Sequence, residues 1–425
     1  MEMKKKPVTG MKDILPKEME IRDYAISLIK ETYKKFGFTS VETPCVEHIE
    51  NLSSKQGGEN EKLIFKILKR GEKLRLEEAQ SAADLVDGGL RYDLTVPLSR
   101  YYSNNANDLP SPFKALQMGN VWRADRPQKG RYRQFMQCDI DILGEPTNLA
   151  EIELILATST LLGKLDFKNF TIRINDRRIL RAMVDYAGFT PLAENDKVDY
   201  DGIFIILDKM DKIGLDGVRE ELISVGNDAA VVDKYLDLFR KVTPDTAGIA
   251  FLKETLGESL ADDIAEGLSF IIENVEAAKE AEFKMAFDPT LVRGMSYYTG
   301  PIFEISMDEY GGSVGGGGRY DEMIGRFTGQ QTPACGFSIG FERIVMLLLE
   351  RDFKVPGSAE KTAFMIEKNM PKDKMAKILA TARERRAAGE CINIVMMKKN
   401  KKFQKDQLTA EGYTEIIEYF SDRDI

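Results

Sequence analysis

The stretch FKALQMGNVWRADRPQKGRYRQFMQCDIDIL, residues 113–143, decides the fold of this 425-residue chain. Two short apolar runs lie on either side of the polar segment 125–131, which predicts two strands joined by a loop. Guanidinium groups suit phosphate, so the loop indicates contact with a triphosphate or a nucleic-acid backbone, with a solvated surface loop as the alternative. Five cations fall within eleven residues: Arg123, Arg126, Lys129, Arg131 and Arg133.

Two further stretches indicate anion binding. The glycine run 315–318 lacks the pattern of a phosphate loop or a dinucleotide-binding turn, but four glycines let a backbone approach a flat ligand closely. A flexible hairpin turn explains the run equally well. Arg343 falls in the first turn of an apolar helix predicted over 341–350, where a cation opposes the helix dipole and requires an anion. That anion is either an internal carboxylate or a bound phosphate. With Arg293, which ends a polar and aromatic strand, these features describe an ATP site held by arginines.

The period of the apolar residues divides the rest of the chain. A helical period over 18–35 and an alternating period over 38–43 come first, and residues 69–87 form a charged, exposed excursion. Residues 177–281 are almost wholly helical in period, which predicts an all-α insertion. After a linker candidate at 354–359, the chain alternates strand, helix, strand, helix, strand, which predicts a small α/β module with a parallel sheet.

Composition excludes several classes of site. The one histidine, His48, excludes a zinc site with two or three histidine ligands and leaves at most one Ser–His or Cys–His pair. The four cysteines are widely spaced, so we expect free thiols in a reducing compartment. The chain contains no apolar run of membrane-spanning length and no signal peptide pattern, so we expect a cytoplasmic protein with no membrane contact.

The net charge of −9 is unevenly distributed. Residues 361–425 hold 14 Lys and Arg against 10 Asp and Glu, which gives +4 and leaves −13 for the first 360 residues. A basic tail on an acidic body favours a polyanionic partner for the tail, and a solvated Lys/Arg face is the alternative.

The chain resembles the class II aminoacyl-tRNA synthetases and, within them, the histidyl-tRNA synthetase family. The first helix and strand with Pro44 are similar to the first signature motif of the class, residues 120–135 to the second, and residues 340–343 to the third. Four stretches resemble the histidine family itself: GMKDILP at 10–16, RYDLTVP at 91–97, LVRGMSYYTG at 291–300 and GGGRYD at 316–321. The resemblance covers residues 7 to about 350 closely and the tail loosely.

This resemblance implies an α+β fold: a class II synthetase-like antiparallel sheet flanked by helices, an all-α insertion and a small C-terminal α/β module. Residues 1–176 and 282–352 would form the catalytic domain, and 177–281 the helical insertion. Residues 360–425 would form a shortened anticodon-binding-like α/β domain, because the family's domain normally continues for a further strand and helix.

The resemblance also implies the reaction. L-Histidine and ATP, with Mg²⁺, would form histidyl-adenylate, and the histidyl group would pass to tRNA(His) on an enzyme expected to be a homodimer. The catalytic residues would be Arg123 and Arg293, both at the α-phosphate, and Arg343 at the γ-phosphate. The histidine-binding set would be Asp93, Leu94, Thr95, Arg123, Gln137, Asp141, Arg293, Tyr297 and Tyr298. The loop that meets ATP and tRNA would hold Asp125, Arg126, Lys129, Arg131 and Arg133.

Physical chemistry agrees with these implied roles. An amino-acid carboxylate is already a nucleophile, so positioning and charge stabilisation suffice without a general base. Recognition of an imidazole needs a hydrogen-bond acceptor and a donor, such as Asp141 and the hydroxyl of Tyr298. No metal held by histidine or cysteine is expected. Ser296 departs from the aspartate usual in the family.

Two other functions make different demands on the sequence. A histidine-binding paralogue that regulates ATP phosphoribosyltransferase should lack the phosphate-binding arginines and the basic loop, both of which this chain keeps. A nucleotide-binding protein of another kind would not need Asp141 together with Tyr297 and Tyr298. The ligase is therefore favoured.

Overall fold

The computed structural model describes residues 3–53, 60–127, 130–192, 196–292, 297–357 and 360–424. The chain divides into two compact units, one made of residues 1–13 and 25–351 and the other of residues 14–24 and 352–425. No helix of the described residues is long and apolar enough to cross a membrane.

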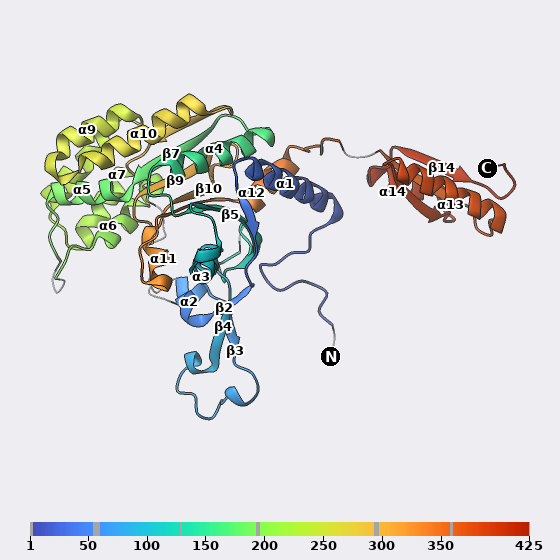
Figure 1. Cartoon of the computed structure of the whole chain (residues 1–425), viewed down its shortest axis with the longest axis horizontal. Helices are drawn as coiled ribbons and strands as arrows, with labels where there is room; N and C mark the ends of the chain where they lie inside the picture. Colours follow the sequence, from blue (N-terminus) through green and yellow to red (C-terminus); the bar gives the residue numbers. More distant parts are fainter. Residues whose placement is uncertain are drawn as a thin grey trace. The chain divides into compact units, whose positions relative to one another are not determined.

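An eight-stranded sheet forms the centre of the larger unit (Figure 1). In spatial order its strands are β1 (Thr39–Val41), β5 (Phe113–Trp122), β6 (Gln134–Leu143), β11 (Ala334–Ile339), β10 (Gly312–Arg319), β9 (Pro301–Met307), β7 (Phe170–Asp176) and β8 (Phe283–Phe287). Neighbouring strands are antiparallel except at the two edges, where β1 pairs with β5 and β8 pairs with β7 in parallel. The predicted flanked sheet is confirmed, with one parallel strand added at each edge.

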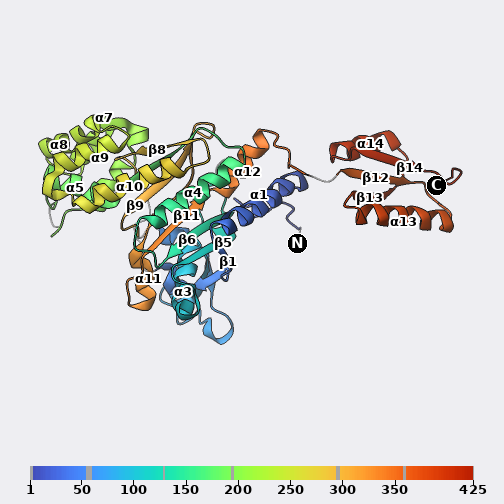
Figure 2. The same cartoon turned by 45° about the horizontal axis from the view of Figure 1, so that its top comes forward.

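The two faces of the sheet differ because side chains alternate along each strand. Lys114 on β5 donates to Glu153 of α4 (Leu149–Lys164) at 2.6 Å, so the even-numbered residues of β5 and β6 face this helix. Figure 2 shows α4 lying across the sheet. On the opposite face, α3 (Thr95–Asn105) and α11 (Asp321–Thr328) contribute to a core that includes Phe113 and Leu143. The odd-numbered face therefore carries the polar residues of β6.

Six α-helices lie between β7 and β8 in the described parts of residues 177–281 (Figure 1): α5 (Arg177–Ala187), α6 (Tyr200–Leu207), α7 (Met210–Ser224), α8 (Ala229–Lys241), α9 (Thr246–Leu256) and α10 (Asp262–Ala278). Aspartates cap four of them: the side chains of Asp176, Asp199, Asp228 and Asp245 accept backbone N–H groups at the starts of α5, α6, α8 and α9. These caps explain where the predicted helical segment divides. The proposed domain boundaries at 177 and 281 stay predictions.

A small antiparallel sheet has the order β2-β4-β3, from β2 (Val46–His48), β4 (Val86–Leu90) and β3 (Lys66–Leu68). Between β3 and β4 the chain is mostly exposed, as predicted for this charged segment. His48 ends β2 and is exposed. Three helical elements also precede β3: α1 (Pro16–Lys35), α2 (Ile49–Ser53) and a short 3-10 helix at Asn60–Leu63.

The smaller unit contains the predicted parallel module. Its elements are β12 (Lys361–Ile366), α13 (Lys372–Ala387), β13 (Cys391–Met396), α14 (Lys401–Ala410) and β14 (Glu415–Tyr419). Central β12 pairs in parallel with β13 and β14. Phe364 and Ile366 pack into one core, and Ala363 and Met365 pack into another. This burial on both faces explains the continuous apolar run of β12.

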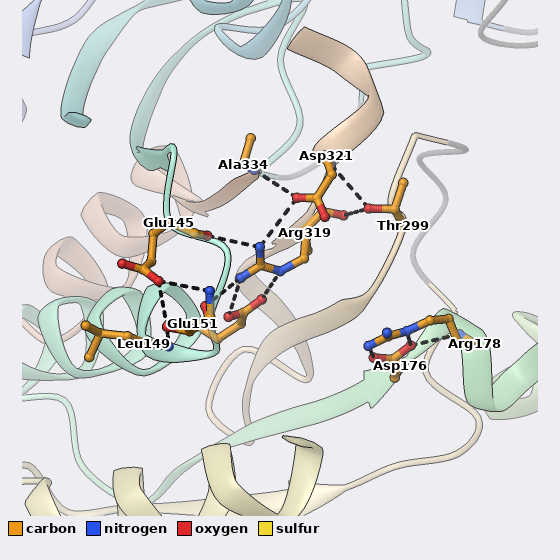
Figure 3. Close-up of polar contacts among 10 residues, drawn as sticks. Glu145, Leu149, Glu151, Asp176, Arg178, Thr299, Arg319, Asp321 and Ala334 are labelled. Carbon is orange, nitrogen blue, oxygen red and sulfur yellow. Dashed lines mark hydrogen bonds and ion pairs between the residues drawn. The ribbon is translucent and has the colours of Figure 1, made fainter. Parts of the chain in front are cut away.

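A buried ion pair joins the end of β10 to α4 (Figure 3). Arg319 Nε and Nη2 donate to the two carboxylate oxygens of Glu151 at 2.7 and 2.8 Å, and the side chains are 8% and 0% exposed. Arg319 also donates to the backbone carbonyls of Glu145 and Thr147 at 3.2 and 2.9 Å. The pair therefore fixes β10, the segment before α4 and α4 itself against one another.

We expect Arg319→Met to lower the free energy of unfolding by about 3–5 kcal/mol, because Glu151 is then left buried without its cation. Arg319→Met combined with Glu151→Leu should recover much of this loss. Urea unfolding of the full chain, followed by circular dichroism, measures both. As a control, Arg219→Met breaks an ion pair with Asp233 whose side chains are 38% and 49% exposed, and it should cost less than about 1 kcal/mol. Equal losses for the two single variants would contradict the role assigned to Arg319.

Candidate active site

A cavity of about 340 Å³ opens on the odd-numbered face of the central sheet. Strands β6, β10 and β11 form its floor, and the start of α12 (Phe341–Glu350) closes one side. The loop between β5 and β6 and the segment before α3 supply the remaining walls. Ten of the predicted residues line it: Asp93, Thr95, Arg123, Asp125, Arg131, Gln137, Asp141, Tyr297, Tyr298 and Arg343.

Five predicted residues lie elsewhere or outside the description. Arg126 is exposed and is not among the lining residues, and Arg133 Nε donates to the carbonyl of Asp125 at 3.0 Å. Lys129 and Arg293, together with Ser296, lie outside the described residues. Leu94 is buried, and its carbonyl accepts from Gln117 Nε2 at 2.9 Å, so its role is to anchor the backbone before α3.

A row of polar side chains on β6 faces the cavity. Gln137, Asp139 and Asp141 are spaced by two residues, so they share one face of the strand. In the neighbouring strand β11, Ser338 lies opposite Asp139 and Gly336 lies opposite Asp141. The row therefore extends across two strands, with small residues beside the carboxylates.

The glycine run is an interior strand, so the interpretation of a flexible hairpin turn is wrong. Gly315 to Gly318 belong to β10 and pair with β9 on one side and β11 on the other. A Cβ on Gly317 would lie 1.9 Å from the carbonyl oxygen of Gly336, and a Cβ on Gly336 would lie 2.1 Å from Asp141 Oδ1. The glycines thus leave space on the floor of the cavity that any side chain would fill. The spacing of apolar residues in the sequence does not predict this space.

Three carboxylates are buried in the cavity. Asp93, Asp139 and Asp141 are 4%, 5% and 3% exposed. Because burial disfavours the ionised form, it raises the pKa of Asp93 and raises that of Asp139 to about 7 and that of Asp141 to about 8. Among the described residues, Asp141 Oδ2 and Gln137 Oε1 are buried acceptors with no hydrogen-bond partner. This end of the cavity therefore suits a ligand that brings N–H donors or positive charge.

Two arginines also line the cavity: the charge of Arg123 acts on Asp93 and Asp139, and Arg343 comes from α12. Arg123 Nε donates to the carbonyl of Tyr92 at 3.1 Å, and the guanidinium carbon lies 4.2 Å from the Tyr92 ring centroid and 5.3 Å from that of Phe135. Arg343, in the first turn of α12, lies over the Tyr310 ring and donates to the carbonyl of Ser313. The first turn of a helix also attracts anions, so both features favour phosphate.

The strand geometry keeps Asp141 and Arg343 apart. β11 passes Asp141 at Gly336 and leads directly into α12, so Arg343 lies beyond the far end of the strand. The polar row of β6 is itself long, because Gln137 and Asp141 are four residues apart, a span of roughly 13 Å. An elongated ligand with donors at one end and anionic groups at the other matches this arrangement.

Two backbone hydrogen bonds of Arg133 hold one end of the basic loop. The N–H of Arg133 donates to the carbonyl of Gly10 at 2.7 Å, and the carbonyl of Arg133 accepts from the N–H of Arg123 at 2.9 Å. Gly10 has φ +83°, and a Cβ there would lie 2.7 Å from Arg133 Cγ and 2.9 Å from Pro127 Cγ. The glycine of the opening motif is therefore required by its contact with the loop.

Buried Arg91 supports the segment that carries Asp93. It donates to the carbonyls of Thr43 and Asn120 at 2.7 and 2.8 Å and crosses Gly119, where a Cβ would lie 2.2 Å from Arg91 Nη2. Asp93 Oδ1 in turn accepts the N–H of Val96 at 3.1 Å. These bonds position residues 91–95 over the polar row.

Asp139, Ser338 and Tyr320 are among the lining residues that sequence reasoning missed. The two-residue spacing between Gln137 and Asp141 could have identified Asp139, because the residue between them on the strand face must point into the same cavity. Tyr320 lies in the family-like stretch 316–321, but that stretch assigns it no role, because its hydroxyl reaches Asp141 across 179 positions of sequence.

Comparisons with known proteins agree on one family. A family model described as histidyl-tRNA synthetase matches residues 10–344. A histidine–tRNA ligase from Leifsonia xyli subsp. xyli is 42% identical over 417 residues, 96% of this chain and 93% of that protein. The crystal structure of a histidyl-tRNA synthetase from Nostoc sp. PCC 7120 superposes with a TM-score of 0.77 at 26% identity, covering 97% of this chain and 90% of that one.

One solved structure shows likeness of fold alone. It is described as an ATP phosphoribosyltransferase regulatory subunit/histidyl-tRNA synthetase from Bacillus halodurans C. It is 21% identical with a TM-score of 0.77, covering 98% of this chain and 99% of that one.

We expect Asp141→Asn to stabilise the ligand-free protein at high pH only. Because its pKa is raised, the carboxyl group of Asp141 contributes stability to the folded protein below pH 3.8, the ordinary pKa of an aspartate. This contribution is lost as the pH rises through about 8, the pKa in the folded protein. The neutral amide has no such loss. The variant should exceed the parent by about 1–3 kcal/mol near pH 8.5 and by much less near pH 5. Thermal unfolding at both pH values measures this, and a difference independent of pH would contradict it.

Proposed function

The chain belongs to the histidyl-tRNA synthetase family, and we propose that its cavity activates L-histidine with ATP and transfers the histidyl group to tRNA(His). As a histidine–tRNA ligase, the protein is an ATP-dependent enzyme that joins an amino acid to RNA. One observation carries the assignment of the cavity to this reaction. A buried oxygen of Asp141 that has no partner among the described residues lines the same cavity as the guanidinium groups of Arg123 and Arg343.

The carboxylate end would hold histidine. The ammonium group would meet Asp93, Thr95 and Gln137, since buried oxygens without donors favour a cation that supplies three N–H groups. The imidazole would give an N–H to Asp141 and meet the hydroxyl of Tyr298. A ligand that lacked these groups would leave the buried oxygens unpaired, which is a strong basis for rejection.

The arginine end would hold ATP. Arg123 would contact the α-phosphate and the histidine carboxylate, Arg343 the γ-phosphate, and Arg293 the α-phosphate. Mg²⁺ would enter with ATP as its phosphate complex, because phosphate oxygens are its usual ligands in such sites. Support for this half comes from the cationic first turn of α12 and from the stacked guanidinium of Arg123.

Two displacements follow from this placement. A histidine carboxylate oxygen attacks the α-phosphorus, and the bond from that phosphorus to the bridging oxygen breaks as pyrophosphate leaves. A terminal ribose hydroxyl of tRNA then attacks the adenylate carbonyl. The bond from that carbon to the phosphate oxygen breaks, AMP leaves with the hydroxyl proton on its phosphate, and the histidyl ester stays on tRNA. The first step needs no base, so its catalysis is alignment and charge stabilisation by arginines. The basic loop 125–133 would contact ATP and the tRNA acceptor end.

Further proposals concern partners and location. Similarity of α1, β1 and Pro44 to the first class II motif supports a homodimer. Exposed lysines 398, 399, 401 and 402 at the start of α14 support contact between residues 360–425 and RNA. Free thiols at all four cysteines and the use of ATP and tRNA support a cytoplasmic location.

The regulatory alternative is not favoured. A subunit that only senses histidine needs neither an arginine in the first turn of α12 nor a cationic loop held at the mouth of the cavity. This chain keeps both, and Arg131 lines the cavity together with Arg343.

ATP–pyrophosphate exchange, measured with each amino acid in turn, tests the activation step. We expect exchange with L-histidine about 10³-fold or more above that with other amino acids, because the buried acceptors penalise ligands without matching donors. Charging of tRNA(His) should follow. Absence of histidine-dependent exchange would reject the ligase, whereas exchange without charging would reject only the proposed RNA contacts.

Arg343→Gln should separate catalysis from stability. Loss of a cation at the triphosphate should lower the exchange rate by about 10²–10³-fold. Stability should change by less than about 1 kcal/mol, because a cation in the first turn of a helix opposes its dipole. The matched control is Arg351→Gln at the other end of α12, where Arg351 pairs with Glu309 and lies over the Phe167 ring. This control should lose stability and keep its exchange rate; the reverse pattern would contradict the placement of ATP.

A further inference from the structure

The hydroxyl of Tyr320 donates a hydrogen bond to one oxygen of Asp141, the carboxylate that we propose binds the substrate imidazole. It donates to Asp141 Oδ1 at 2.5 Å, and the Tyr320 side chain is almost completely buried, at 2% exposure. Oδ2 of the same carboxylate has no partner among the described residues. The two oxygens of Asp141 are therefore unequal: one is bound within the protein and the other is available to a ligand.

Tyr320 is itself held from three directions. Its backbone N–H donates to the carbonyl of Ala334 on β11 at 2.7 Å, and its ring packs in the core with Met323 and against Tyr297, 6.0 Å between centroids. The preceding residue, Arg319, is fixed by Glu151. The hydroxyl consequently has one position, set by the backbone and by packing rather than by the ligand.

Gly336 provides the space in which this hydrogen bond forms. A Cβ at residue 336 would lie 2.1 Å from Asp141 Oδ1 and 3.2 Å from Tyr320 Cε1. Any side chain there would displace the carboxylate oxygen that Tyr320 holds. The hydroxyl of Tyr320, after the end of β10, and the lack of a side chain at Gly336 on β11 thus fix the same oxygen, Asp141 Oδ1.

We propose that Tyr320 is a positioning residue that, with Gly336 leaving room, turns Asp141 so that its free oxygen faces the substrate imidazole. This inference rests on the proposed function, because it takes the imidazole as the group that Asp141 contacts. Tyr320 touches neither ATP nor the reacting carboxylate in this arrangement. Its effect therefore falls on recognition of histidine and spares the chemical step.

Tyr320→Phe tests the proposal while keeping the buried ring. We expect KM for histidine to rise about tenfold, while KM for ATP and kcat change less than about twofold. The pH profile supplies a second readout. Loss of a donor to the ionised carboxylate raises the pKa of Asp141, so the acid limb of kcat/KM for histidine should move to higher pH. Asp139, Asp93 and Tyr297 face the same cavity and are unchanged in the variant.

Gly336→Ala reaches the same oxygen from the other strand. It should also raise KM for histidine, and the double variant with Tyr320→Phe should be no worse than Gly336→Ala alone, because both changes release one carboxylate. If Gly336→Ala does not fold, Tyr320→Phe decides the question alone. Tyr235→Phe is the matched control: Tyr235 is fully buried on α8, and its hydroxyl has no partner among the described residues. Its kinetic constants should match those of the parent.

The outcomes separate this inference from the proposed function. If the parent shows no histidine-dependent exchange, the function itself fails. If the parent is active and Asp141→Asn loses histidine affinity while Tyr320→Phe does not, the positioning role is overturned and the function stands. A fall in thermal midpoint and kcat in Tyr320→Phe, with no change in KM for histidine or in the pH profile, also overturns the inference and leaves Tyr320 a structural residue.

Discussion

The bidentate ion pair between Arg319 and Glu151 is the interaction on which the rest of the site depends. It locks the end of β10 to α4 without access to water, and the next residue after Arg319 is Tyr320. From there a single hydrogen bond reaches Asp141 on β6. Because Tyr320 directly follows Arg319, the buried salt bridge restricts the position of Tyr320 and, through its hydrogen bond, that of Asp141. Buried pairs add little net stability, so their value here is the geometry that they impose.

The polar groups of the cavity lower the stability of the ligand-free protein. Asp93, Asp139 and Asp141 are buried together, and burial raises the pKa of each because the charged forms are poorly solvated. An isolated domain selected only for stability would place apolar side chains there. A ligand that brings an ammonium and an imidazole N–H supplies the missing donors. Affinity and selectivity then come from the same unpaired groups that weaken the empty site.

The sequence predicted those parts of the fold that local patterns specify. Apolar runs located β5 and β6, and helical period located the segment between β7 and β8. The glycine run was ambiguous because a residue without a side chain has no hydrophobic period, and only pairing with β9 and β11 shows it to be a strand. Asp93 lies in a family-like stretch, and Gln137 and Asp141 were implied by the resemblance to the family. Tyr320 was missed because its role depends on packing between β10 and β6, which no spacing along the chain encodes.

Charge separation explains how one cavity can bind two oppositely charged partners. Three carboxylates beside a triphosphate would repel it strongly in a water-poor site, since the interaction between charges grows as the effective dielectric falls. The structure reduces this repulsion by separating Asp141, which lies opposite Gly336 of β11, from Arg343 beyond the end of that strand, and the first turn of α12 adds positive potential there. Only the histidine carboxylate would have to reach the arginine end, which is where an attack on the α-phosphorus must occur. The single histidine of the chain, exposed His48, does not line this cavity. The imidazole that the cavity would recognise therefore belongs to the substrate alone.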